Sequence, residues 1–233
     1  MPRGTRGTPP VLMNHLVDRI GASLEGLGRR LRGKPRHAQQ VALPKLRLGR
    51  GEYYARYAIA PDLLHQGAVI YSFGIGDHVE FELELVGRFG CKVLLFDPEP
   101  LAVGRLRAQQ LPPQVLVHSL GLSDRDGVAS SGQARGNGYA SEQQLRRLTT
   151  LMDQFGHGHI DLLKMDIEGA EYAVIDALSA SGVRPTQILV EFHHHLRHLS
   201  LSHTERALTQ LNRLGYRIFD CQDGGHEFSL VLV

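Results

Sequence analysis

Short apolar runs alternate with longer amphipathic segments from about residue 50 to the end of the chain. The apolar runs predict buried strands at Val69–Phe73, Lys92–Phe96, Gln114–Ser119, Ile160–Met165, Gln187–Phe192, Arg217–Cys221 and Glu227–Val231. Between them, Glu142–Phe155 and Thr204–Leu214 carry apolar residues at helical spacing. This alternation is typical of βαβ units and predicts an α/β domain with a mostly parallel sheet.

Two segments indicate how the predicted strands are connected, and therefore whether neighbouring strands run parallel or antiparallel. Val79–Leu85 alternates strictly between apolar and polar residues, which is the period of a strand. We nevertheless expect a helix there, because neighbouring parallel strands are joined by crossovers that are nearly always helical. The last two strands are joined only by Gln222–His226, which is too short for a crossover, so we expect an antiparallel pair.

Composition places the chain among ordinary globular proteins. Its 233 residues are 42% apolar and 21% charged, which excludes collagen-like, coiled-coil and wholly disordered proteins. This length suffices for one buried core, and we expect a single catalytic domain over residues 51–233. The two cysteines, Cys91 and Cys221, lack the spacing of a disulfide framework or a zinc site and fit a reducing compartment.

Residues 1–50 form a basic leader. They hold eleven Lys or Arg and two acids, so the leader carries +9 and the rest of the chain −7. Apolar residues at helical spacing over Val11–Leu31 predict an amphipathic helix. We favour a helix docked on the domain with a solvated basic face over an anchor, and expect at most weak contact with an anionic membrane surface and no nucleic-acid partner. Without a signal peptide or a membrane span, we expect a soluble, cytoplasmic protein.

A glycine-containing turn follows the first predicted strand. It reads Phe73-Gly74-Ile75-Gly76-Asp77, and its glycines allow a sharp bend and the close approach of a ligand to the backbone. The helix start that follows offers free N–H groups to a polar ligand. Position 79 is Val, so the third glycine of a dinucleotide fingerprint is absent.

An acidic residue, Asp97, ends the second predicted strand, 21 residues after Gly76. An acid at this distance from a glycine turn is placed to hold the two hydroxyls of a ribose. The alternative is a residue that only caps the next helix. We favour the ribose site, with Pro98 ending the strand.

Three acids cluster at the end of a central strand, in the run Asp166-Ile167-Glu168-Gly169-Ala170-Glu171. The carboxyl ends of parallel strands line the crevice in which open α/β sheets bind ligands. Asp166 and Glu168 are therefore candidates to receive a cationic group or a metal. Glu171 has two equally weighted interpretations, a site residue or an acid that only stabilises the first turn of a helix.

The next predicted strand ends in Glu191-Phe192-His193-His194-His195. Imidazole is the commonest protein metal ligand, but adjacent side chains of a strand point to opposite faces, so these three histidines cannot share one ion while the strand persists. We expect no metal site. Glu191 and His193 are candidates for a general base or for gripping the substrate.

A long loop over Gly127–Ser141 is rich in Gly and Ser and nearly without apolar residues. A loop of this length in a compact domain is often a lid over a ligand. We expect a substrate lid, with contacts from Arg135, Asn137 and Tyr139.

These motifs together resemble the FkbM-type, S-adenosylmethionine-dependent methyltransferases over roughly residues 52–233. The resemblance is carried by Phe73–Asp77, Phe96-Asp97-Pro98-Glu99-Pro100, Gly121-Leu122-Ser123-Asp124, Leu162–Glu171 and Glu191–His194, of which LLKMDIEGAE is the most specific. It implies the Rossmann-like class I methyltransferase fold, which has a seven-stranded sheet with an antiparallel last strand and helices on both faces.

The resemblance also implies S-adenosyl-L-methionine as cofactor. Gly74, Gly76 and Asp77, with Phe73 and Ile75 of the same motif, would line its methionine part. The ribose would be held by Asp97 beside Pro98. Ser123 and Asp124 would lie at the adenine edge, and Asp166 and Glu168 would face the sulfonium or the methyl acceptor.

The implied reaction is O-methylation of a sugar, a lipid-linked glycan or a small hydroxylated metabolite, with His193 or Asp166 as the base. Ser72 stands where many methyltransferases carry an acid, and His78 where a third glycine is common. These departures keep open a non-catalytic binding module with this fold. A nicotinamide-dependent oxidoreductase is a second alternative, because it shares the glycine turn and the ribose acid, although the missing third glycine and the terminal hairpin count against it. The sequence leaves the oligomeric state undetermined.

Overall fold

The structure, a computed structural model, describes residues 39–49, 57–76, 78–130, 142–222 and 224–233. The amphipathic helix predicted over Val11–Leu31 lies outside these residues. So does Asp77 of the glycine turn.

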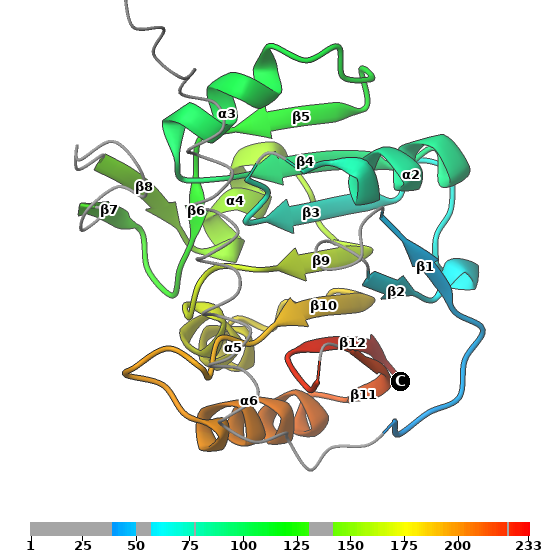
Figure 1. Ribbon diagram of the computed structural model, residues 1–233. Coiled ribbons are helices and arrows are strands. Elements are labelled where there is room, and N and C mark those ends of the chain that lie inside the picture. The colour runs from blue at the N-terminus through cyan, green and yellow to red at the C-terminus, as the bar shows by residue number, and fades with distance from the viewer. Residues whose placement is uncertain (1–38, 50–56, 77, 131–141, 223) are drawn as a thin grey trace, which may run out of the picture.

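A seven-stranded sheet forms the centre of the domain, with the order β11-β12-β10-β9-β3-β4-β5 (Figure 1). Its strands are β3 (Val69–Phe73), β4 (Lys92–Phe96), β5 (Val115–His118), β9 (Leu162–Met165), β10 (Gln187–Glu191), β11 (Tyr216–Gln222) and β12 (Glu227–Leu232). β12 runs antiparallel to both of its neighbours, while the pairs from β10 to β5 are parallel. This topology confirms the fold class expected from the sequence, including the antiparallel terminal pair.

Two hydrophobic cores cover the two faces of this sheet. On one face, Tyr71, Leu163 and their neighbours pack against α4 (Leu148–Phe155), α5 (Glu171–Ser181) and α6 (Leu201–Arg213). The opposite face packs against α2 (Glu80–Phe89) and α3 (Pro100–Arg107). Successive side chains of a strand point to opposite faces, which is why Tyr71 and Ile70 belong to different cores.

The segment with strand-like alternation is helical, as expected. In α2, Phe81, Glu82, Leu85 and Val86 are buried, and the helix ends at Gly90 with φ of 65°. A left-handed residue at a helix end satisfies the last carbonyl groups, and glycine takes this conformation without steric cost. The crossover argument therefore identified this element correctly where the period alone indicated a strand.

The prediction of a helix over Glu142–Phe155 is wrong for the first half of that segment. Glu142–Arg146 is a strand, β8, and only Leu148–Phe155 is helical. β8 pairs with β7 (Gly127–Ser130) on one side and with β6 (Gly121–Leu122) on the other, and this pairing outweighs the helical preference of its residues. Asp126 fixes the start of α4, because its carboxylate accepts hydrogen bonds from Arg147 N–H at 2.8 Å and from Thr150 Oγ1 at 2.9 Å.

The strands β6, β8 and β7 form a small sheet beside the carboxyl ends of the central strands (Figure 1). The predicted lid over Gly127–Ser141 thus begins as a strand rather than a loop. Residues 131–141, with the proposed contacts Arg135, Asn137 and Tyr139, lie outside the described residues.

Residues 39–48, placed in the leader from the sequence, form a strap along the domain. β1 (Leu46–Leu48) pairs antiparallel with β2 (Tyr57–Ile59), which is followed by a short 3-10 helix, η1 (Pro61–Leu63). Lys45 and Arg47 both reach the buried carboxylate of Asp220 on β11, at 2.6 and 3.0 Å. Among the described helices, none combines the length and the apolar character that crossing a bilayer requires.

Candidate functional site

The glycine turn after β3 contains two glycines with different structural roles. Gly74 has φ of 75°, and a Cβ at this position would lie 1.6 Å from the backbone oxygen of Asp166. Gly76 has φ of 57°, but a Cβ there would meet no atom of the described residues within 4 Å. The backbone contact between β3 and β9 therefore requires Gly74, whereas Gly76 leaves open space beside the turn.

Asp97 faces this turn from the end of β4. Its Oδ2 accepts a hydrogen bond from Gly76 N–H at 2.9 Å, and its Oδ1 accepts one from Glu99 N–H at 2.8 Å. The side chain is nearly buried, and this burial raises the pKa of Asp97 against the opposing effect of its backbone hydrogen bonds. The cap of α3 is Glu99, whose carboxylate accepts from Leu101 N–H, so Asp97 does not cap that helix.

The remaining predicted cofactor contacts surround this pair. Phe73 and Ile75 are buried, with Phe73 stacked on Phe96 at a centroid distance of 4.5 Å. Pro98 packs against Gly121, where an added Cβ would lie 3.1 Å from the proline ring. Two residues further on, Ser123 Oγ donates a hydrogen bond to Asp124 at 3.0 Å. The turns after β4 and β6 are therefore neighbours at the carboxyl edge of the sheet.

Asp166 follows β9 at the same edge. Its side chain is 31% exposed and lies 3.5 Å from His193 Nε2. Burial, followed by the charge of Glu191, raises the pKa of Asp166 to about 7, although Lys164 and His193 act in the opposite direction. A carboxylate that titrates near neutral pH and remains accessible is suited to proton transfer.

Glu168 occupies a strained backbone conformation. Its φ of 56° is the only positive value among the described non-glycine residues. The carboxylate of Glu168 is half exposed and lies 3.7 Å from His193 Nε2. Left-handed backbone at a residue with a Cβ costs about 1–2 kcal/mol and tends to occur at functional sites.

His193 is buried between three of these acids. Its Nδ1–H donates to Glu171 Oε1 at 2.8 Å, and its Nε2 faces Asp166 and Glu168. Burial disfavours the charged imidazole, but the hydrogen bond and charge of Glu171 outweigh it and raise the pKa of His193 to about 9. Glu191, the last residue of β10, is also buried and contributes to this shift.

The three consecutive histidines do not share one set of contacts, although the ring centres of His193 and His195 lie 5.5 Å apart. His194 Nδ1 lies 3.1 Å from Thr204 Oγ1, and its ring stacks on His226 at 4.2 Å. His193 instead contacts Glu171. Within the described ranges, no group of three or more His, Cys, Asp or Glu side chains is arranged to hold a metal ion.

Sequence reasoning missed a buried polar cluster beneath the site. Ser72 Oγ donates to Glu82 Oε1 at 2.6 Å, and Lys164 Nζ lies 4.0 Å from the same oxygen. Lys164 also lies over the ring of Tyr57, 5.2 Å from its centroid. Ser72 and Lys164 are paired in register on neighbouring strands. The carboxylate absent from position 72 is thus supplied by α2, and the helical spacing of Val79, Glu82 and Val86 could have indicated this buried acid.

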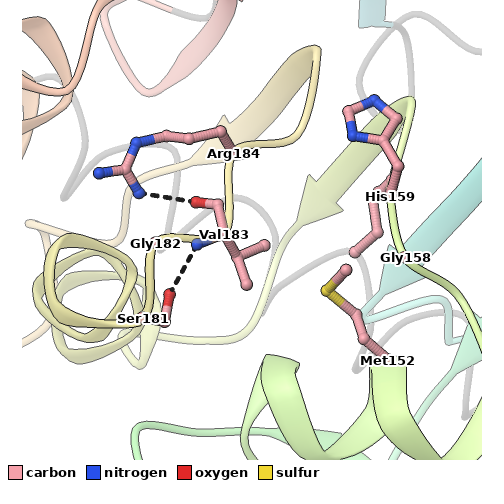
Figure 2. A pocket seen from close by; sticks show the side chains of 8 residues that line it. Met152, Gly158, His159, Ser181, Gly182, Val183 and Arg184 are labelled. Atoms are coloured by element: carbon pink, nitrogen blue, oxygen red, sulfur yellow. Dashed lines mark hydrogen bonds between the residues drawn. The ribbon is translucent and has the colours of Figure 1, made fainter.

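A pocket of about 360 Å³ lies at the opposite edge of the sheet (Figure 2). His159 precedes β9 and Arg184 precedes β10, so the pocket is at the amino ends of these strands. Figure 2 shows the hydrogen bond from the Arg184 guanidinium to the Val183 carbonyl, 2.8 Å long. The same nitrogen donates to the Leu178 carbonyl of α5 at 2.9 Å. The pocket is separate from the acids at the carboxyl edge.

The chain aligns with curated methyltransferase-like proteins over 70% of its length. The chain is 29% identical over 175 residues to the probable methyltransferase-like protein 24 of Rattus norvegicus, an alignment covering 70% of this chain and 46% of that protein. Its Homo sapiens counterpart is 27% identical over the same length, covering 70% and 45%. The chain therefore spans about half the length of these curated relatives.

Among solved structures, Aeropyrum pernix fibrillarin with natively bound S-adenosyl-L-methionine aligns with a TM-score of 0.43 and 12% identity. That alignment covers 72% of this chain and 68% of the other. The model of the methyltransferase FkbM domain matches residues 60–218, which include the glycine turn, Asp97, Asp166 and His193. The chain thus belongs to the FkbM methyltransferase family.

Proposed function

We propose that this chain is an S-adenosylmethionine-dependent methyltransferase that methylates a hydroxyl group of a sugar, glycan or small hydroxylated metabolite. The observation that carries the proposal is the contact between Gly74 and the Asp166 backbone. It joins the glycine turn and Asp97, which suit a nucleoside, to the accessible acid beside His193. Both halves of the site therefore lie at one edge of the sheet, and family membership supports the same reaction class.

The residues around Gly76 and Asp97 fit S-adenosylmethionine. Both Asp97 oxygens accept backbone N–H groups, and because a carboxylate has about four lone-pair sites, Asp97 can also accept a hydroxyl of a ribose. The open space at Gly76 admits a ligand close to the backbone. When bound, S-adenosylmethionine supplies an electrophilic methyl carbon on a sulfonium. Gly76, Asp97 and the turn at Ser123 and Asp124 would hold its nucleoside, and Ile75 would border its methionine part.

Asp166 is the better base of the two candidates. Its carboxylate is 31% exposed, whereas the His193 side chain is 4% exposed and faces Asp166 rather than solvent. An acceptor hydroxyl beside Asp166 would give its proton to the carboxylate while the oxygen forms a bond to the methyl carbon and the carbon–sulfur bond breaks. The leaving electron pair stays on sulfur, so the protein must position the two reactants and accept one proton.

The alternatives lose part of their support. A non-catalytic module was suggested by the missing acid at position 72, but Glu82 places a carboxylate on the Ser72 hydroxyl. An oxidoreductase was suggested by the glycine turn and Asp97, which both functions share. The family match favours methyl transfer.

Calorimetry with S-adenosylhomocysteine and NADH tests the proposal on the full chain. We expect S-adenosylhomocysteine to bind and Asp97→Asn to weaken binding about 10-fold or more, because a charge-assisted hydrogen bond contributes about 1.5–3 kcal/mol. Asp62→Asn, at an exposed residue of η1, is the matched control and should bind as the unmodified chain does. Binding of NADH alone would favour the oxidoreductase, and binding of neither would favour the non-catalytic module.

A further inference from the structure

Glu171 and His193 form a buried pair behind Asp166. Glu171 is fully buried and His193 is 3% exposed. The Glu171 Oε1 that accepts from His193 Nδ1–H also accepts from Ile167 N–H at 2.9 Å. The carboxylate is therefore held by two donors, and it in turn fixes the plane of the imidazole ring and favours its protonated form.

The second ring nitrogen connects this pair to the exposed acids. His193 Nε2 lies 3.5 Å from Asp166 Oδ1 and 3.7 Å from Glu168 Oε2. A methyl acceptor can approach the Asp166 carboxylate from solvent, because that side chain is partly exposed. It cannot approach the His193 ring, because that ring is buried. A helix-dipole role explains why an acid is tolerated at the start of α5, but it does not explain a hydrogen bond to a side chain 22 residues away.

We propose that His193, oriented by Glu171, is a positioning residue that favours the ionised, proton-accepting form of the Asp166 carboxylate against the burial and the acids that favour its protonated form. This inference rests on the proposed methyl transfer for its purpose, but the coupling of the three side chains can be tested without it. Glu171 is a positioning residue as well, since it acts through His193. Neither residue needs to contact the acceptor.

The acids around Asp166 favour its protonated form, so a nearby positive charge is needed to favour the ionised form. Asp166 faces Glu191 at the end of β10 and Glu168 in its own turn, and both charges favour its protonated form. Lys164 on β9 and His193 oppose them. His195, whose ring centre lies 5.5 Å from that of His193, is the other titratable ring in contact. Replacing the imidazolium with a neutral side chain should therefore raise the pKa of Asp166 further.

Histidine NMR titration of the full chain tests the first link. Glu171→Gln keeps the size of the side chain and removes its charge, and we expect it to lower the midpoint of His193 by about one pH unit or more. Asp176→Asn removes a charge from an exposed position of the same helix and should leave the midpoint unchanged. The His193 resonance is identified by its loss in His193→Gln. An unchanged midpoint in Glu171→Gln would overturn the proposal.

Carboxyl-carbon NMR of Asp166 tests the second link. We expect its midpoint to lie near 7 in the unmodified chain and to rise by about one unit in both His193→Gln and Glu171→Gln. If either variant unfolds, the other still gives the answer, and thermal melting identifies the folded one. A midpoint that does not move in a folded variant refutes the positioning role. These titrations require no cofactor, so they are independent of the proposed function. That function would be refuted instead if the unmodified chain did not bind S-adenosylhomocysteine.

Discussion

Gly74 and Asp166 meet backbone to backbone where β3 and β9 end, with no room for a side chain on Gly74. This contact fixes the distance between the turn that suits a nucleoside and the acid that suits proton transfer. The two glycines of the turn should therefore respond differently to substitution, although both have positive φ.

We expect Gly74→Ala to lower the free energy of unfolding by about 3 kcal/mol or more, because a Cβ 1.6 Å from the Asp166 oxygen must displace backbone. Gly76→Ala places a Cβ more than 4 Å from every atom that the described part of the chain brings near it, so it should cost only the conformational penalty of about 1–2 kcal/mol. Urea denaturation of both variants measures the difference. Equal losses would show that the close contact does not exist in solution.

Glu168→Gly should stabilise the protein. Glycine removes the left-handed penalty of Glu168, and its more flexible unfolded chain offsets part of the gain, so we expect a net rise of about 0.5–1 kcal/mol. The control Asp176→Gly, at an exposed position within a helix, should instead lose about 0.3 kcal/mol, the difference between the helix propensities of Asp and Gly. Glu168→Ala also removes the carboxylate beside His193 but keeps a Cβ, so if Glu168→Gly were no more stable than Glu168→Ala in chemical denaturation, the backbone of Glu168 would not be strained.

The buried pair of Lys164 and Glu82 should be coupled energetically. Removing one partner by Lys164→Met or by Glu82→Gln leaves the other without its partner in a dry environment, and we expect each change to cost about 3 kcal/mol. The double variant should cost less than the sum by about 1 kcal/mol or more, because the loss of both leaves no isolated charge. A double-mutant cycle from denaturation data checks this, and strict additivity would contradict it.

Stability should fall as pH rises from about 6.5 to 9. His193 has a folded-state pKa raised from 6.5 to about 9, so its stabilising contribution is complete below 6.5 and is lost as pH rises through 9. We expect the advantage of the unmodified chain over His193→Gln to shrink by about 2 kcal/mol across this window. Urea titrations at pH 6.5, 8 and 9.5 measure it, and a constant difference would count against the raised pKa.

Asp166 also makes the stability of the fold fall as pH rises, but over a lower pH range than His193. Its folded-state pKa rises from 3.8 to about 7, so its protonated form is favoured on folding and stability declines between these values as pH increases. In the unmodified chain the two windows overlap only near pH 7. In His193→Gln the Asp166 window should extend upward by about one unit, so the contribution of His193 is read from the measurements above that range.

The sequence was sufficient for the central sheet because buried parallel strands leave apolar runs that are visible without tertiary information. It also located Asp97 and Asp166, since the carboxyl ends of such strands follow directly from the runs. The strand β8 was not predictable in this way, because its residues have helical preferences and only its pairing with β6 and β7 makes it extended.

Contacts between distant residues were also beyond the sequence. The orientation of α2 about its axis brings Glu82 to Ser72. The position of α5 beside the end of β10 brings Glu171 to His193. Periodicity specifies which face of a helix is buried, but it does not specify which strand residue a buried acid will meet. The partners that tune the site therefore became visible only in three dimensions.

The strap over residues 39–48 protects one margin of the sheet. Gln40 and Val41 donate backbone N–H groups to the carbonyl of Ile218 on β11, and the Gln40 side chain accepts the N–H of the same residue. Unpaired groups at a sheet margin can recruit a strand from another molecule and start aggregation. A shortened version of this protein should therefore retain these residues, because they shield that outermost strand from self-association.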